Sequence, residues 1–497
     1  MKYSLFKKST LVIGTVVAVG GCGGDTHRAP LEADEQLQNI IAEKSLTGDP
    51  SAGRTLPDIE SPLAQLGMQL FFTKGLGGDQ DSACVTCHHP TLGGGDDLSL
   101  SIGVEAEIAD LLGPGRTHSS SGTHYDGGPT VPRNAPTTFN MSLWDQFIFH
   151  DGRVESLTKT AGENGANGGI RTPDSAFGVA DVNAGTNLTA AQARFPVTSP
   201  EEMRGFTFEA GNSNDDVRSH LEDRLQGIGG ELATNSWLSA FRTGLNDATG
   251  ASADLITYAN IANAIAEYER SQTFVDTPWK DYVEGDADAL TDDQKAGAVL
   301  FFTSVAGGGA GCASCHSGDF FSDEKFHVIA VPQIGRGKGN GTTGTDDFGR
   351  FRETGVENDR YAFRTPSLLN VTETGPWGHA GAHTTLESIV RYHLDPTQAY
   401  SSYDVNQLES SVQVGDMEVN TQAALAQLEL LQASGDSLLV DTTLNDTKVM
   451  ALVAFLGALT DPCVTNSTCI GQWVPSGTDA NPDDLRLNAV NESGDPL

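Results

Sequence analysis

The chain has 497 residues, of which 38% are hydrophobic and 19% charged, as expected for a globular protein of two or three domains. Its 66 acidic and 30 basic residues give a formal net charge of −36. This charge excludes nucleic acid as a partner, because phosphates would be repelled. It allows electrostatic attraction of a basic protein. An acidic surface that only keeps the protein in solution explains the charge equally well.

The first 22 residues have the pattern of an export signal. A basic start is followed by an apolar run, Leu11 to Val19, that is too short for an ordinary membrane span. The run continues into Val19-Gly20-Gly21-Cys22, which resembles a bacterial lipobox. That resemblance implies acylation of Cys22, a lipid as the only membrane anchor, and a periplasmic location. Ordinary secretory cleavage nearby is the alternative, and it also predicts export.

Residues 23–55 are polar and lack a helical period, which predicts a linker. A helix is then expected from Ser61 to Phe72, where apolar residues recur at helical spacing.

The run Cys84-Val85-Thr86-Cys87-His88 has the C-x-x-C-H pattern of c-type haem attachment. On one helical turn the two thiols face the same way, and the adjacent histidine can reach the iron. The pattern recurs as Cys312-Ala313-Ser314-Cys315-His316. One match alone could be half of a zinc site. Two matches that both end in histidine predict two covalently bound haem c groups.

The regions between and after these motifs contain long loops and helices. Glycine-rich stretches at about 93–138 and 160–187 predict loops, and residues 215–285 have helical periodicity. A helix at 290–302, with Thr291 as its N-cap, precedes the second motif as the helix at 61–72 precedes the first. The chain therefore contains a diverged duplication.

The fold class expected is mostly α, with two cytochrome c-like haem domains in tandem, long loops and little β structure. The expected domains are residues 56–285 and residues 286–460. A further strong helix is expected at 449–459. Cys463 and Cys469 are close enough in sequence for one disulfide, and the polar tail, 461–497, is expected to be loosely ordered.

Several further motifs resemble those of the bacterial di-haem cytochrome c peroxidases and the related MauG enzymes. The resemblance covers most of residues 60–460. It rests on these runs: Leu66-Gly67-x-x-Leu70-Phe71-Phe72, Ser101-Ile102-Gly103, Arg133-Asn134-Ala135-Pro136-Thr137, Asp151-Gly152-Arg153, Asp346-Asp347-x-Gly349-Arg350, Tyr361-x-Phe363-Arg364-Thr365-Pro366-Ser367-Leu368 and Pro376-x-x-His379-x-Gly381.

The resemblance implies different roles for the two haems. His88 would be the proximal ligand of the haem that reacts with peroxide, and His316 that of the haem that accepts electrons. Gln192 and Glu202 match the family's distal pair, and a carboxyl near bound peroxide can move a proton between its oxygens. A solvated loop acid beside Glu201 is the alternative reading of Glu202.

The family also implies a calcium ion between the domains. Asn134, Thr374 and Pro376 occupy the matching positions, and their oxygens suit a hard cation when waters complete the shell.

Three departures from the family pattern carry information. The position after Ser-Ile-Gly, often histidine, is Val104, which predicts an open iron at His88 unless His118 or His124 reaches it. The tryptophan before Asp-Gly-Arg is replaced by His150, which is either an electron-transfer aid together with Trp144 or an ordinary packed histidine.

The third departure concerns the ligand opposite His316. Where many peroxidases have methionine, this sequence has His393, with Tyr392 beside it. Either residue would lower the potential of the second haem relative to a thioether ligand.

The leading functional prediction is an enzyme, a di-haem peroxidase that reduces hydrogen peroxide with electrons from a small cytochrome c or cupredoxin. The alternatives are a MauG-like enzyme that oxidises side chains of a partner protein and a non-catalytic di-haem electron carrier or sensor. The open iron site argues against the carrier, which has no need of one. A homodimer is a further expectation.

Overall fold

The computed structural model describes residues 33–497, so the predicted signal segment, Cys22 and the start of the linker lie outside the described residues. The described chain is mostly helical, with 38% helix and 6% strand, which confirms the predicted fold class. No helix between residues 33 and 497 is long and apolar enough to cross a membrane.

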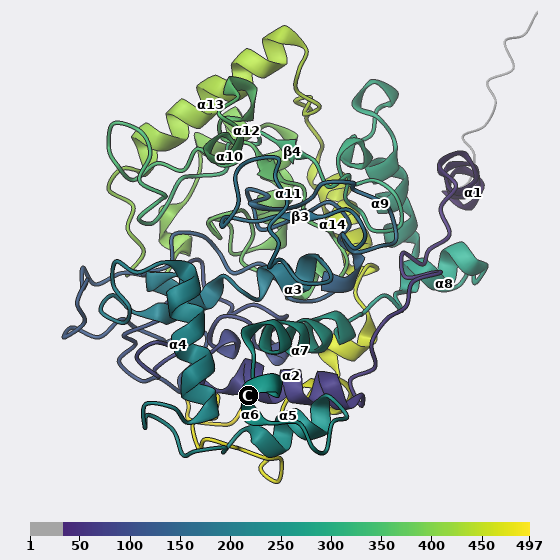
Figure 1. Cartoon of the computed structure of the whole chain (residues 1–497). Helices are drawn as coiled ribbons and strands as arrows, with labels where there is room; N and C mark the ends of the chain where they lie inside the picture. The colour runs from purple at the N-terminus through teal and green to yellow at the C-terminus, as the bar shows by residue number, and fades with distance from the viewer. Residues whose placement is uncertain (1–32) are drawn as a thin grey trace, which may run out of the picture.

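Two groups of helices lie one above the other, with loops and small sheets between them (Figure 1). The helices are α1 (Ala33–Lys44), α2 (Pro62–Phe72), α3 (Leu188–Gln192), α4 (Asn214–Gln226), α5 (Leu238–Gly244), α6 (Ser252–Leu255), α7 (Tyr258–Ser271), α8 (Pro278–Glu284), α9 (Asp292–Phe302), α10 (Phe351–Thr354), α11 (Leu386–Leu394), α12 (Pro396–Tyr400), α13 (Met417–Ser434), α14 (Asp446–Gly457) and α15 (Ser467–Ile470).

The strands are short and form two antiparallel sheets. The first has the order β1-β2-β3 and the second pairs β4 with β5. In the first sheet Ile148 pairs with Val154 and Ser156 with Ile170, and in the second Phe326 pairs with Arg364. The strands are β1 (Phe147–Ile148), β2 (Val154–Ser156), β3 (Ile170–Arg171), β4 (Phe326–His327) and β5 (Phe363–Arg364).

The predicted duplication is visible as two equivalent pairs of crossing helices. In the first half α2 packs on α7, and in the second α9 packs on α14. A Cβ on Gly67 would lie 1.9 Å from the carbonyl oxygen of Ala264, and one on Gly297 would lie 1.9 Å from that of Ala451. Only glycine allows backbones to approach so closely. Each half therefore depends on the same glycine contact.

Both of these helices are capped at their N-termini, and the cap of the second, Thr291, is the one predicted from the sequence. The Ser61 side chain accepts the Ala64 N–H at the start of α2, and Thr291 accepts the Gln294 N–H at the start of α9. Within the region of helical periodicity at 215–285, α6 and α7 are separate helices, because Thr257 caps a new helix.

The hydrophobic cores lie on either side of the central loops. The first is built by α2, α4, α5 and α7, and the second by α9, α14 and their neighbours. Helix α8, assigned from sequence to the first domain, places Trp279 in the second core, where it stacks on Phe302. The second packing unit therefore begins before the expected boundary at residue 286.

The segment predicted as a linker is not a free linker from residue 33 onward. It contains α1, whose Leu37 is fully buried in the second core. Asp34 in α1 pairs with Lys295 at 2.9 Å and accepts the Tyr282 hydroxyl at 2.8 Å. A mainly polar helix with one buried leucine gives little periodic signal, which explains the wrong prediction.

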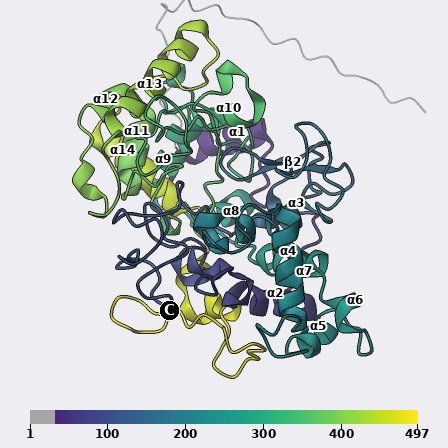
Figure 2. The ribbon, with the colours of Figure 1, turned by 60° about the vertical axis from the view of Figure 1, so that its left-hand side comes forward.

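The C-terminal tail is not loosely ordered, in contrast to the prediction. It returns to the first half and runs beside α2 and α5 (Figures 1 and 2). The Leu487 N–H donates to the Phe72 carbonyl at 2.8 Å, and the Leu487 side chain is 2% exposed. Asp483 accepts the Thr73 hydroxyl at 2.7 Å and the Trp237 indole N–H at 3.0 Å. Cys463 and Cys469 form a disulfide at the start of this tail.

Candidate functional site

Both C-x-x-C-H motifs line one cavity of about 590 Å³ between the two halves. In each motif the residues from the first cysteine form a short 3-10 turn, Cys84–Thr86 and Cys312–Ser314. All four cysteines have free thiols, although each pair has the spacing of a redox disulfide. Free thiols and a histidine around a largely apolar cavity are what covalent haem attachment requires.

At the end of the cavity formed by the second half, two imidazoles face each other. The ring centroids of His316 and His393 are 6.4 Å apart. Metal–nitrogen bonds of about 2 Å put two imidazoles on opposite sides of one iron at roughly this separation. His393 Nδ1 bonds the Ile389 carbonyl at 2.8 Å, and His316 Nδ1 lies 3.1 Å from the Pro366 carbonyl. Because a carbonyl only accepts, both Nε2 atoms are left as ligands.

The neighbouring Tyr392 points away from this space. Its hydroxyl donates to the Ala330 carbonyl at 2.5 Å, and its ring is 1% exposed in a core beside α13. Of the two candidates for the ligand opposite His316, the structure therefore directs His393 toward the cavity.

The end of the cavity formed by the first half has a different environment. His88 Nδ1 bonds the Gly94 carbonyl at 3.1 Å, which leaves its Nε2 for a metal. Val104 is fully buried, and its N–H donates to the Glu201 carbonyl. His118 lies 3.3 Å from Glu105, and His124 packs on Phe206. None of Val104, His118 and His124 is among the described residues that line the cavity.

Gln192 and Glu202 both line the cavity at this end. Gln192 is the last residue of α3, and its Oε1 is buried without a hydrogen-bond partner within residues 33–497. Glu202 lies in a π-helical turn, Pro200–Arg204, whose backbone rests on Gly103. Turns of this type recur at functional sites. The backbone of the Ser101-Ile102-Gly103 motif thus supports the loop that carries the acid.

Burial raises the pKa of the Glu202 carboxyl above its usual range, and the charges of Arg153 and Lys338 oppose that effect. Both cations line the same cavity. Lys338 comes from the second half, on a glycine-rich loop, and burial lowers its pKa. Arg153 belongs to a motif, but Lys338 gave no signal in the sequence because only the packing of the halves brings it here.

Another buried acid was missed by the sequence analysis. Glu269, in α7, lines the cavity and is 2% exposed. Burial raises the pKa of this carboxyl to about 8, so it is largely protonated at neutral pH. Residue spacing alone gave no sign of it, since a glutamate on a helix is usually solvated.

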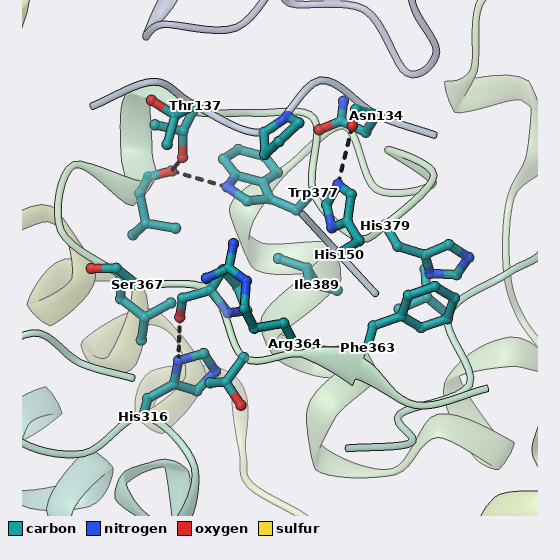
Figure 3. Close-up of a pocket in the computed structure, with 18 of the residues that line it drawn as sticks. Asn134, Thr137, His150, His316, Phe363, Arg364, Ser367, Trp377, His379 and Ile389 are labelled. Atoms are coloured by element: carbon teal, nitrogen blue, oxygen red, sulfur yellow. Dashed lines mark hydrogen bonds between the residues drawn. The ribbon is translucent and has the colours of Figure 1, made fainter. Parts of the chain in front are cut away.

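The middle of the cavity contains His150, which stands at the position of the family's tryptophan (Figure 3). His150 Nε2 bonds the Asn134 carbonyl oxygen at 3.1 Å, and burial lowers the pKa of this imidazole to about 3. His150 lines the cavity, and its part in electron transfer stays a prediction. Trp144 lies under the Arg364 guanidinium, 3.4 Å from ring centroid to carbon, and Arg364 also lines the cavity.

The other motifs form a buried ionic contact that joins the halves. Arg133 donates to Asp347 from two nitrogens, at 2.6 and 2.8 Å, and to Asp151 at 2.6 Å. Arg350 reaches back across the interface to the carbonyls of Asp151 and Gly152. Motifs far apart in the sequence thus fix how the two ends of the cavity face each other.

The three residues expected to bind calcium, Asn134, Thr374 and Pro376, also line the cavity. The Asn134 side-chain amide donates to the carbonyls of Leu98 and Ser99, which orients the group. No cluster of three or more His, Cys, Asp or Glu residues suited to a metal occurs within residues 33–497. The donors expected for calcium here are amide and carbonyl oxygens, so the absence of a His, Cys, Asp or Glu cluster does not test this site.

Comparison with known proteins agrees with this arrangement. The model of the di-haem cytochrome c peroxidase family matches residues 61–288. The methylamine utilization protein MauG of Methylorubrum extorquens is 27% identical over 390 residues, covering 77% of this chain and 83% of that protein. The cytochrome c551 peroxidase of Pseudomonas aeruginosa is 26% identical over 329 residues, covering 66% and 70%.

Solved structures share the fold. A MauG-like protein associated with microbial copper homeostasis superimposes with a TM-score of 0.52 at 20% identity, covering 84% of this chain and 97% of that one. The diheme peroxidase BthA of Burkholderia thailandensis gives 0.50 at 19% identity, covering 89% and 93%. The structures share the fold, and the sequence matches, together with the two haem-attachment motifs, confirm the resemblance of this chain to the di-haem cytochrome c peroxidases and MauG.

Proposed function

We propose that the protein is a di-haem c peroxidase, in which hydrogen peroxide, two electrons and two protons give two waters. The observation that carries the proposal is the difference between the two ends of the cavity. His316 is faced by an imidazole, whereas the His88 end is lined by a carboxyl and an amide. An end where two imidazoles could hold the iron suits electron transfer, and an end with a proton-carrying group suits a reaction with peroxide.

In this proposal Cys84, Cys87 and His88 would hold a haem c, whose iron would supply the redox chemistry for peroxide. Glu202 accepts a proton from one peroxide oxygen and returns it to the oxygen that leaves. The direction of its pKa shift favours this role, because a carboxyl whose pKa is raised holds a proton more readily than an ordinary glutamate does. Gln192 offers a buried amide to orient peroxide, and Arg153 and Lys338 stabilise the carboxylate form of Glu202.

The electron donor in this proposal is a small cytochrome c or cupredoxin in the periplasm. The net charge of −36 supports a basic donor, because opposite charge speeds encounter. Cys22 remains the proposed lipid attachment point.

The test is stopped-flow mixing of the purified holoprotein with peroxide, with and without a reduced small cytochrome. Rapid oxidation of the cytochrome at a rate that depends on peroxide is expected. Haem spectra that do not respond to peroxide would leave only an electron carrier or sensor. A six-coordinate, low-spin spectrum for both oxidised haems would contradict the open site at His88.

A second candidate is a MauG-like enzyme that oxidises side chains of a partner protein. It is favoured by His393, since an imidazole ligand in place of a thioether lowers the potential of the second haem. A low-potential haem is a poorer acceptor from ordinary cytochromes. A long-lived oxidised species after peroxide, without turnover of the reduced cytochrome, would support this candidate over the first.

We also propose calcium at Asn134, Thr374 and Pro376. Calcium takes six to eight oxygen ligands and these residues supply three, so waters must supply the rest. Equilibration with a calcium chelator, followed by metal analysis and thermal unfolding, tests this site. A protein that contains no calcium as isolated and does not bind added calcium would rule it out.

A further inference from the structure

Beside the second end of the cavity, aromatic rings form a continuous series that ends at Tyr400, which is 8% exposed. His383 contacts Tyr392 at a centroid distance of 4.8 Å and Tyr403 at 5.6 Å, and Tyr403 stacks with Tyr400 at 6.3 Å. These separations are those of ordinary aromatic pairs in contact. We call these four residues the tyrosine relay: Tyr392, His383, Tyr403 and Tyr400.

The inner end of the tyrosine relay is joined to the cavity wall through its neighbours, since His393 and Trp377 line the cavity whereas Tyr392 and His383 do not. Tyr392 precedes His393 in α11, and both Tyr392 and His383 are 1% exposed. His383 exchanges two backbone hydrogen bonds with Trp377, whose ring lines the cavity (Figure 3). The tyrosine relay therefore begins at Tyr392, the residue next to His393 in the chain, and His393 faces His316.

The outer end differs from the inner end in the partner of its phenol. The Tyr400 hydroxyl donates to the carboxylate of Glu418 at 2.9 Å, and Glu418 is exposed to solvent. By contrast, Tyr392 and Tyr403 donate to the backbone carbonyls of Ala330 and Ala382. A phenol loses its proton when it loses an electron, and a carbonyl cannot take that proton while a carboxylate can. Within the relay, only Tyr400 is paired with a base.

We propose that the tyrosine relay gives the protein a second oxidation site, at Tyr400 and Glu418, where small phenols act as one-electron donors. This inference rests on the proposed function, because peroxide is the oxidant. Tyr400 gives an electron inward along the relay and its proton to Glu418. A phenol then returns one electron and one proton to the Tyr400 radical, while Glu418 releases its proton to water. Two such cycles supply the two electrons that one peroxide consumes, and the two protons released balance the two that it takes up.

The experiment adds one equivalent of peroxide to the full-length holoprotein containing ring-deuterated tyrosine, and freezes it for electron paramagnetic resonance. The variants are Tyr400→Phe, which keeps the ring, and Glu418→Gln, which removes only the base. Tyr282→Phe is the matched control, because Tyr282 also donates to a carboxylate, that of Asp34, but lies outside the relay. Peroxide-driven oxidation of guaiacol and of a reduced small cytochrome is measured on the same samples.

The wild type and Tyr282→Phe are expected to give a tyrosyl signal, and both relay variants to lose most of it. Guaiacol oxidation should fall with the signal, while cytochrome oxidation stays unchanged. If the haem spectra respond to peroxide but Tyr400→Phe and Glu418→Gln keep the radical and the guaiacol rate, the relay is wrong and the proposed function stands. If the wild-type haems do not respond to peroxide, both proposals fail together.

Discussion

The two halves pack their helices in the same way but place different groups around their haem positions. In each half a helix crosses its partner at a glycine and is followed by a C-x-x-C-H turn. The halves diverge in the segments that line the two ends of the cavity: a helix carrying His393 in the second, and a π-helical turn carrying Glu202 in the first. The helix pair determines where a haem can attach, and the facing segment determines what chemistry is possible there.

The largest effect should come from removing the acid of the first half. Glu202→Gln keeps the shape but cannot accept a proton, so the rate of reaction with peroxide should fall by about 10²–10⁴-fold. Stopped-flow absorbance on the holoprotein measures it. Glu201→Gln is the matched control, since the Glu201 carboxylate lies beside the Ser199 hydroxyl. Equal losses in both variants would mean that Glu202 has no special role.

A second change should make the second half resemble the first. His393→Gly removes the imidazole that faces His316, so one of the two haems should lose its low-spin spectrum and bind an added ligand such as imidazole. Tyr392→Phe should leave the absorption spectrum as it is, because its hydroxyl points to Ala330. If Tyr392→Phe instead alters the spectrum and His393→Gly does not, the ligand assignment is reversed.

A third change tests whether the shared packing is equally important in both halves. Gly67→Ala and Gly297→Ala each push a methyl group against a backbone carbonyl, so each should reduce the free energy of unfolding by about 1–3 kcal/mol. Gly457→Ala, where a Cβ meets nothing within 4 Å, should be close to neutral. Urea denaturation measures all three. A cost in only one half would show that the duplicated contact has lost its role in the other.

The smallest effect concerns the ionic contact between the halves. Burial and the Arg133 charge act in opposite directions on Asp347, and the net result lowers the pKa of this carboxyl to about 2. A lowered pKa stabilises the fold fully above the unfolded value of about 3.9 and loses that contribution as pH falls toward 2. The stability difference between wild type and Asp347→Asn should therefore shrink, by roughly 2 kcal/mol at most, between pH 6 and pH 3. Urea denaturation at both pH values measures it, and a constant difference would contradict the assignment.

Local signals were enough to predict much of this molecule. Thr291 caps its helix as predicted, and the duplicated motif locates both haem-attachment turns. Features that depend on distant contacts were not predictable. The choice between Tyr392 and His393 needs the rotation of α11 relative to the cavity, and adjacent helical residues point in directions about 100° apart. Lys338 and the buried Leu37 are likewise placed by the packing of segments far apart in sequence.

The position of the C-terminal tail has a consequence for the order in which the protein can be completed. Chains are made from the N-terminus, and a domain usually folds as soon as its own residues have emerged. The first half, however, receives Leu487 into its core and Asp483 against Trp237 only when the last residues are available. The core of the first half is thus completed last, although its C-x-x-C-H motif is the first to be synthesised.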